Sequence, residues 1–252
     1  MNKLIQGLLF SGTIYDEVAF SRKVKLFFPK AEVIPWMNQT DFFATVMIDG
    51  TLNIVLRGTD GTDFKKWTSA WINNFHLSVG SNGIHDGFEE SVKRIWVILK
   101  SIVMANDYDH LNIFGHSRGG AETPLLGNII ANATNRYVDC YSYGAPPSGN
   151  LMWLKTFELT RYKGLINNIY VVNPRDVITV LFRDHLTPKT DGYDVGTRFL
   201  LPEDTWQQKL FKCIPGACEH SPREYCDGLK MVFKKNKEAV SQLKAIRKVL
   251  VN

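Results

Sequence analysis

The sequence predicts an α/β protein whose central sheet is mostly parallel and carries helices on both faces. Strand-like and helix-like segments alternate along the chain, and this order is typical of parallel strands joined by helices. The hydrophobic fraction of 44% and the charged fraction of 22% exclude a disordered or fibrous chain. A chain of 252 residues can bury a large core, so we expect a single domain over residues 1–252.

The first two strands are predicted over 41–49 and 50–58, joined at Asp49 and Gly50, a dipeptide typical of hairpin turns. A helix is predicted over 88–106 because its apolar residues share one face. These residues are Val92, Ile95, Trp96, Leu99, Ile102 and Val103. The alternation then continues with a strand over 110–115, a helix over 121–132, and strands over 137–144 and 167–173.

The two ends of the chain are both expected to be helical. The apolar run in residues 1–12 continues into 13–20, which we interpret as one helix of the folded domain rather than a signal peptide. Residues 229–252 are predicted to form a basic C-terminal helix, apolar on one side and rich in lysine on the other. We expect it to dock on the body of the protein; the alternative is a segment that lies on an anionic bilayer.

The charge and the apolar runs exclude several classes of protein. The net charge of +5 is small and is concentrated near the C-terminus, and no nucleic-acid-binding motif or phosphate loop occurs, so we expect no nucleic-acid partner. No apolar run is long enough to span a membrane. The expected location is the cytoplasm, or outside the cell after release without a standard signal, and the residues leave both open.

Three of the four cysteines lie close together near the C-terminus. Cys213 and Cys218 could close a short disulfide loop in an oxidising compartment, and whether Cys226 takes part is left open. The same cysteines lie near His220, but their spacing matches no familiar zinc site, so we predict no metal site.

The segment 111–125, "LNIFGHSRGGAETPL", places Ser117 between Gly115 and Gly119, directly after a predicted strand and before a predicted helix. A serine on such a sharp turn has an exposed hydroxyl, and only glycines leave room for the backbone on either side. The N-terminal amides of the following helix point at the same site, so the N–H of Arg118 can donate to a developing oxyanion. The segment therefore indicates a nucleophile elbow.

A serine nucleophile needs a base, and the base needs an acid that orients it. In hydrolases built on a parallel sheet these follow in the order serine, acid, histidine. Asp176 comes just after the strand-like segment 167–173, which makes it the best candidate for the acid. Among the later histidines we prefer His220 to His185 as the base, because His220 is late and lies between turn signals. The acids that follow no clear strand are Asp184, Asp191 and Asp194.

These blocks together resemble the class 3 lipases, the fungal-type triacylglycerol lipases with an α/β-hydrolase fold. The resemblance covers about residues 4–226 and rests on several blocks that occur in the family's order. They are "NIVLRGTDGTDFKKWTSAWINN", "GIHDGF", "LNIFGHSRGGA", "YSYGAPPSGN", "NIYVVNPRDVI" and "EHSPREY". Ser117, Asp176 and His220 match the family's nucleophile, acid and base.

The resemblance also implies an oxyanion hole and a substrate contact. Thr59 matches the position whose backbone N–H and hydroxyl complete the oxyanion hole, beside the amide of Arg118. Trp67 and Trp71 lie where the family carries a lid, and they could touch an acyl chain or belong to the core. His85 matches a position that supports the sheet.

Two residues beside the nucleophile need a separate interpretation. His116 is expected to pack or to orient its neighbours rather than to take part in catalysis. Arg118 stands where the family usually has an apolar residue, and it would favour an anionic substrate if its guanidinium faced the cleft. Pro124 is expected to kink or shorten the helix that contains it, because it lacks an N–H group.

The predicted function is that of a serine carboxylic-ester hydrolase, a lipase or esterase that cleaves acyl esters of lipids through an acyl-enzyme. The reaction calls for no metal and no organic cofactor. The expected partner is a lipid or another acyl ester, with possible peripheral contact to a lipid surface. The alternatives are a phospholipase, thioesterase or acyltransferase with the same triad, or a non-catalytic module that binds a membrane or a protein.

Overall fold

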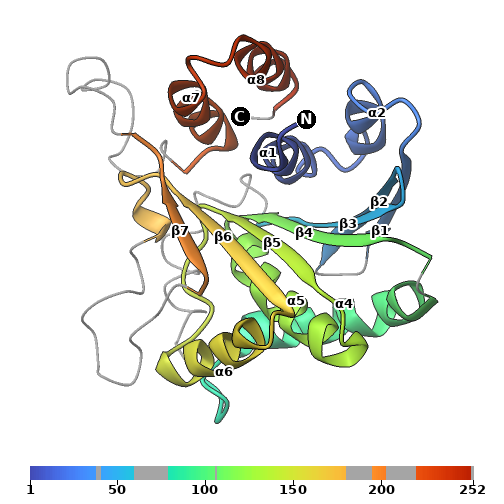
Figure 1. Cartoon of the computed structure of the whole chain (residues 1–252), viewed down its shortest axis with the longest axis vertical. Coiled ribbons are helices and arrows are strands. Elements are labelled where there is room, and N and C mark those ends of the chain that lie inside the picture. Colours follow the sequence, from blue (N-terminus) through green and yellow to red (C-terminus); the bar gives the residue numbers. More distant parts are fainter. Residues whose placement is uncertain (38–40, 60–78, 106, 180–194, 203–219, 251–252) are drawn as a thin grey trace.

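The fold consists of a central sheet between two layers of helices (Figure 1). The computed structural model describes residues 1–37, 41–59, 79–105, 107–179, 195–202 and 220–250. Within these residues seven strands form one sheet, in the order in which they occur in the chain. They are β1 (Glu32–Met37), β2 (Phe42–Ile48), β3 (Thr51–Leu56), β4 (His110–His116), β5 (Val138–Tyr143), β6 (Ile166–Val172) and β7 (Thr197–Leu200).

The sheet is mixed, as the sequence predicts. β1, β2 and β3 pair antiparallel, and every later neighbouring pair up to β7 is parallel. Parallel strands all present their carboxyl ends at the same edge of the sheet, where open α/β sheets carry their sites. β4 and β6 both end at this edge, and Ser117 and Asp176 follow them in the chain.

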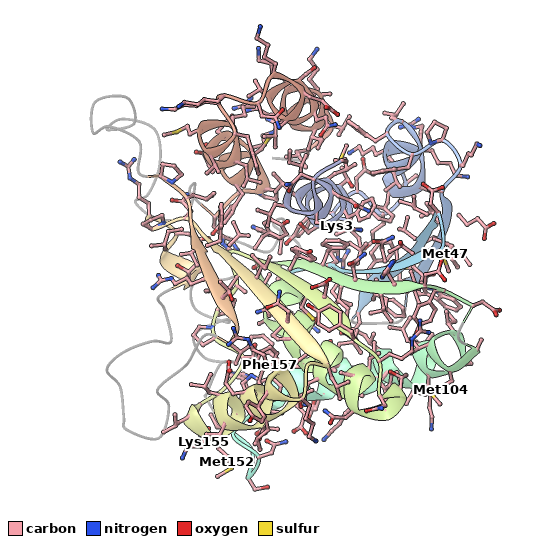
Figure 2. The ribbon with its side chains drawn as sticks, in the orientation of Figure 1. Lys3, Met47, Met104, Met152, Lys155 and Phe157 are labelled. Carbon is pink, nitrogen blue, oxygen red and sulfur yellow. The ribbon has the colours of Figure 1, made fainter. Side chains whose placement is uncertain are left out.

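Helices cover both faces of the sheet, which confirms the predicted arrangement (Figure 1). One layer contains α1 (Lys3–Thr13), α2 (Phe20–Lys25), α7 (Pro222–Val232) and α8 (Lys237–Val249). The other contains α4 (Asp86–Ala105), α5 (Arg118–Thr134) and α6 (Leu151–Tyr162). On α6, Phe157 is buried toward the sheet, whereas Met152 and Lys155 lie on the outer side of the helix (Figure 2). The predicted apolar face of α4 is also confirmed, since Val92, Ile95, Leu99 and Val103 are all buried.

The hairpin between β2 and β3 has the predicted turn. Asp49 and Gly50 both have positive φ, 45° and 71°, and Ile48 pairs directly with Thr51. Two central residues with positive φ define the type of turn that matches the twist of the flanking strands. β1 is not among the predicted strands; it lies at the edge of the sheet, where Pro35, which cannot donate to the ladder, is tolerated.

The predicted continuous helix at the N-terminus is wrong. α1 ends at Thr13, and a turn separates it from α2, which begins at Phe20. The turn forms because the Asp16 carboxylate accepts a hydrogen bond from the Ala19 N–H at 3.0 Å, a local bond that competes with helix continuation. α1 itself belongs to the core, since Leu8, Leu9 and the other residues from Ile5 to Thr13 are buried.

The predicted single helix over 229–252 is also corrected, because the structure has two helices there. α7 ends at Val232, and the Asn236 side chain caps the start of α8 by accepting from the Ala239 N–H at 3.0 Å. An asparagine at this position favours a new helix start over continuation. The pair does dock on the body: Leu243 is buried, and α7 and α8 both contact α1.

Pro124 neither ends nor shortens α5, which continues to Thr134. Proline cannot donate the helical hydrogen bond to the carbonyl four residues earlier, here that of Gly120. The Ser142 hydroxyl on β5 donates to that carbonyl instead, at 2.8 Å. The helix tolerates Pro124 because the neighbouring strand satisfies the acceptor that the proline leaves free.

Within the described part of the chain, no helix is both long and apolar enough to cross a membrane. The same residues contain no cluster of three or more histidine, cysteine or acidic side chains suited to a metal ion. Cys140 and Cys226 are buried free thiols, so Cys226 takes part in no disulfide. Cys213 and Cys218 lie outside the described residues.

Candidate active site

Ser117 lies on a sharp turn between β4 and α5. Its backbone has φ 59° and ψ −127°, a conformation that non-glycine residues rarely adopt and that costs about 1–3 kcal/mol. The Ser117 N–H donates to the Tyr143 carbonyl on β5 at 2.9 Å, which helps to hold the turn. Although Ser117 is at the N-cap position of α5, its hydroxyl makes no capping hydrogen bond. The hydroxyl is therefore available to other partners.

The glycines around Ser117 are required by close backbone contacts. A Cβ on Gly115 would collide with the Gly119 carbonyl, and a Cβ on Gly119 would collide with the Leu56 carbonyl at the end of β3. Gly58 is similarly enclosed, and a Cβ there would lie 3.0 Å from the Cβ of Ser117. The strand, the turn and the helix pack so tightly that only residues without side chains fit on either side of the serine.

His220 lies between Ser117 and Asp176. Its Nε2 is 2.8 Å from the Ser117 Oγ, and its Nδ1 is 2.8 Å from the Asp176 Oδ2. All three side chains are buried, and Asp176 has no exposed surface. The three residues come from separate positions: the end of β4, the turn after β6, and the residue before the N-cap of α7. The structure thus brings together the three residues that the sequence predicts as a triad.

Two further groups donate hydrogen bonds to the Asp176 carboxylate. The Ile178 N–H donates to Oδ1 at 2.9 Å, and the Tyr225 hydroxyl donates to Oδ2 at 2.6 Å. Burial and the Asp176 charge raise the pKa of Tyr225 well above its usual value, so the phenol keeps its proton. A buried carboxylate is stable only when its oxygens are hydrogen-bonded, and these donors with His220 supply that environment.

His116 holds the backbone of His220. Its Nε2 lies 2.7 Å from the His220 carbonyl oxygen, and its Nδ1 lies 2.9 Å from the Tyr15 hydroxyl. Burial lowers the pKa of His116 well below its usual value, and the nearby His220 lowers it further, so His116 stays neutral. A neutral ring with its proton on Nε2 donates to the carbonyl and accepts from Tyr15. This geometry agrees with the predicted orienting role.

Thr59 lies just after β3, at the same edge of the sheet as Ser117. Its hydroxyl oxygen is buried and has no hydrogen-bond partner among the residues that the structure describes. A buried hydroxyl without a partner is uncommon, because leaving it unpaired costs about 1–3 kcal/mol. Arg118 is the first residue of α5, so its backbone N–H lies outside the helical hydrogen-bond pattern. These are the two predicted oxyanion donors.

The Arg118 side chain is bound to two carboxylates. Its Nε donates to the Glu122 Oε1 at 2.7 Å, and its Nη2 donates to the Asp41 Oδ1 at 2.6 Å. The side chain is 25% exposed, and each carboxylate is 2% exposed. Because the guanidinium is already paired with two acids, the arrangement does not favour the anionic substrate that a free cation would attract.

Two other predicted roles can be compared with the described residues. His85 is buried, its N–H donates to the Ser148 carbonyl at 3.0 Å, and its ring packs on Phe88 at a centroid distance of 4.7 Å. This is the supporting position that the sequence predicts. Trp67 and Trp71, the predicted acyl-chain contacts, lie outside the described residues. The rival acids and histidine of the segment 180–194 also lie outside them.

Sequence reasoning missed several residues of the site, namely Tyr15, Asp41, Glu122 and Tyr225. Tyr225 could have been found from the residues, because it lies about one turn into a helix that begins with Ser221 and Pro222, just after His220. Glu122 could also have been found, since it lies four residues after Arg118 on one helix face. Tyr15 and Asp41 are distant in the chain and carry no such local signal.

Comparisons with known proteins agree with this fold. The family model for "Lipase (class 3)" matches residues 53–185, just over half of the chain. A comparison with curated protein sequences gives no match. The lipase of Rhizopus microsporus var. chinensis is 18% identical, with 80% of this chain and 73% of that chain covered and a TM-score of 0.60. The Rhizomucor miehei lipase propeptide complex is 18% identical, with 87% of this chain and 75% of that chain covered and a TM-score of 0.62. A Penicillium expansum triacylglycerol lipase is 15% identical, with 78% of each chain covered and a TM-score of 0.57.

At these identities the solved structures establish the fold only. The match to the family model, over more than half of the chain, establishes the family. The mixed sheet and the helices on both of its faces agree with this fold. The chain belongs to the class 3 lipase family and is a carboxylic ester hydrolase with the α/β-hydrolase fold.

Proposed function

We propose that this protein hydrolyses acyl esters of lipids through a covalent acyl-enzyme on Ser117. His220 Nε2 takes the proton from the Ser117 hydroxyl as its oxygen forms a bond to the ester carbonyl carbon. The bond to the alcohol oxygen then breaks, and the alcohol leaves with the proton held by His220. A water molecule, activated by the same nitrogen, attacks the acyl carbon and releases the acid and the free serine.

Asp176 holds His220 in the state that this reaction requires. Its Oδ2 accepts a hydrogen bond from the Nδ1–H group, which leaves the Nε2 lone pair directed at the Ser117 Oγ. The negative charge also stabilises the imidazolium that forms in the transition state. His116 contributes by fixing the backbone carbonyl of His220.

The observation that carries the proposal is the continuous chain of two 2.8 Å hydrogen bonds from the strained serine through His220 to Asp176. Strain, burial and an oriented base at one residue are what an activated nucleophile needs, and a serine that only shapes a turn needs none of them. The Thr59 hydroxyl, which has no hydrogen-bond partner among the residues that the structure describes, would supply a donor for the oxyanion.

Substitution of Thr59 by Val tests the oxyanion hole. Val has nearly the same shape but no hydroxyl, so the transition state loses one donor while the ground state loses no hydrogen bond to a described residue. We expect kcat to fall by about 10²–10³-fold, with the thermal midpoint unchanged or slightly raised. Steady-state kinetics and calorimetry measure the two. An unchanged kcat would remove Thr59 from the proposed oxyanion hole.

The substrate class is tested with a panel of matched acyl substrates. We expect faster turnover of neutral glycerides than of phospholipids. The reason is that Arg118, the cation nearest the nucleophile in sequence, is already paired with two carboxylates. Preference for a phospholipid, a thioester or an alcohol acceptor would move the assignment to a phospholipase, thioesterase or acyltransferase with the same triad.

A further inference from the structure

The side chain of Arg118 presents a problem that the reaction itself does not explain. Arg118 is the first residue of α5, where the helix dipole is positive, and a cation there is destabilising by about 0.3–1 kcal/mol. No acidic residue lies in the first turn to offset it. The same residue carries the amide that we assign to the oxyanion hole. A costly side chain at this position needs a physical reason.

Neighbouring carboxylates compensate the positive charge of Arg118, within a row of four side chains that alternate in sign and include Arg118 itself. Arg118 lies between Glu122 on its own helix and Asp41 at the start of β2. On the far side of Asp41, Arg94 of α4 donates from Nε to Oδ2 at 2.8 Å and from Nη2 to Oδ1 at 3.2 Å. The Ser91 hydroxyl, also on α4, donates to Oδ1 at 2.8 Å. We call Asp41, Arg94, Arg118 and Glu122 the arginine clamp.

The arginine clamp joins the elements that surround the nucleophile. Asp41 precedes β2, Arg94 lies on α4, and Arg118 and Glu122 lie on α5. Asp41 and Glu122 are almost completely buried, whereas Arg94 has a side chain that is 43% exposed. Buried carboxylates persist only with good partners, and removal of one partner leaves an uncompensated charge. The Arg118 guanidinium is therefore held in one place by groups that themselves cannot move freely.

We propose that Asp41 and Glu122 are positioning residues that act through the Arg118 side chain to hold the Arg118 backbone amide in the oxyanion hole. The amide belongs to the peptide that follows the strained Ser117. A strained turn persists only when its surroundings over-determine it. The glycine contacts and the Ser117 N–H hydrogen bond fix the turn on the sheet side. The arginine clamp fixes it on the helix side, through Glu122 on α5 and Asp41 before β2.

The consequence for the reaction is a matter of geometry. An oxyanion donor must lie within hydrogen-bonding distance of the place where the charge develops, and a misplacement of about 1 Å can cost 10²-fold in rate. The inference rests on the proposed function, because it assumes that Ser117 attacks an ester. It extends that function by assigning a positioning role to two buried acids that act through the Arg118 side chain.

The test is a double-mutant cycle between Glu122→Gln and Arg118→Met. Gln keeps the shape of Glu122 and removes its charge, and Met keeps the Arg118 amide and removes the guanidinium. Arg247→Gln is the matched control, because Arg247 also donates to a carboxylate, that of Asp227, but lies on α8 and outside the arginine clamp. For each variant we would measure kcat, KM, the thermal midpoint and the rate ratio between an ester and its thionoester, in which sulfur replaces the carbonyl oxygen.

We expect Glu122→Gln to lower kcat about tenfold, with little change in KM, and to lower the ester-to-thionoester ratio, because a misplaced donor discriminates less between oxygen and sulfur. Arg247→Gln should keep kcat and the rate ratio within about twofold of the wild-type values. In the Arg118→Met background, Glu122→Gln should lower kcat no further, since the two residues act as a unit. If Glu122→Gln does not fold, Asp41→Asn removes the other carboxylate that binds Arg118. We expect it to lower kcat and the ester-to-thionoester ratio in the same way.

Independent, multiplying losses of kcat in the double variant would overturn the inference, as would a fall in thermal midpoint with an unchanged rate ratio. Either result would make Asp41 and Glu122 structural residues only. Failure of the proposed function has a different signature, because the wild-type protein would then hydrolyse neither the ester nor the thionoester. A wild type that is active, with variants that keep its rate ratio, removes the clamp and leaves the triad in place.

Discussion

Replacement of Ser117 by Ala is expected to lower kcat for ester hydrolysis by about 10⁶-fold, to the small residual rate that binding and the oxyanion donors provide. Ala keeps the Cβ and the backbone N–H bond to Tyr143, and it removes only the oxygen that lies 2.8 Å from His220. The change in free energy of unfolding should stay within about 1 kcal/mol, because one hydrogen bond is lost. Hydrolysis of a p-nitrophenyl ester and a denaturant titration measure the two quantities.

A control variant is needed to separate loss of the Ser117 oxygen from a general loss of a buried hydroxyl. Ser142→Ala is the matched control, since it removes another buried hydroxyl from the neighbouring strand, where it bonds the Gly120 carbonyl. The control should keep most of the activity and lose some stability. Substantial ester hydrolysis by the Ser117→Ala variant would show that another residue performs the attack.

Replacement of Asp176 by Asn is expected to lower kcat by about 10⁴-fold. The Asn oxygen can keep the hydrogen bond from the Ile178 N–H at the Oδ1 position, and the NH2 group then faces His220 Nδ1 in place of Oδ2. His220 would be held with its proton on Nε2, where it cannot accept the Ser117 proton. The variant also loses the charge that stabilises the imidazolium.

Tyr225→Phe is the comparison for this variant. It removes one hydrogen bond to the same carboxylate oxygen but keeps the charge, so its loss of kcat should be much smaller than that of Asp176→Asn. Stopped-flow measurement of acyl-enzyme formation separates the chemical step from substrate binding. Similar losses in both variants would mean that orientation of Asp176, rather than its charge, limits the rate.

The parts of the fold that could be predicted are those with local signals. The hairpin turn at Asp49 and Gly50 is specified by residues that tolerate positive φ, and α4 is specified by its one apolar face. The glycines around Ser117 are informative for the same reason, since the backbone contacts exclude any side chain there. In each case a few neighbouring residues determine the local conformation.

The predictions that failed depend on contacts between distant parts of the chain or on a single cap. Pro124 was expected to kink or shorten its helix, and it does not shorten it, because Ser142 of β5 satisfies the carbonyl that the proline leaves free. Asn236 divides the C-terminal segment into two helices through one capping hydrogen bond. The apolar pattern of that segment continues through the break, so periodicity alone does not reveal it.

The site likewise contains residues with local sequence signals and residues that depend on contacts between distant parts of the chain. The order and spacing of Ser117, Asp176 and His220 could be predicted, because each follows a recognisable strand or turn. The partners that support them could not all be predicted: Tyr15 lies 101 residues from His116, and Asp41 lies 77 residues from Arg118. Such pairs form only through the packing of the two helical layers on the sheet, which the residues near the nucleophile do not encode.

The most direct test of the central claim is to locate the residue that reacts with a fluorophosphonate probe, by mass spectrometry of the digested protein. The probe reacts with a serine only when a base and an oxyanion hole activate it, so it reports the assembled site rather than the sequence motif. We expect one phosphonylated residue, Ser117, in the wild type, and no labelling after Ser117→Ala or after denaturation. Labelling of another serine, or no labelling of the folded wild type, would contradict it.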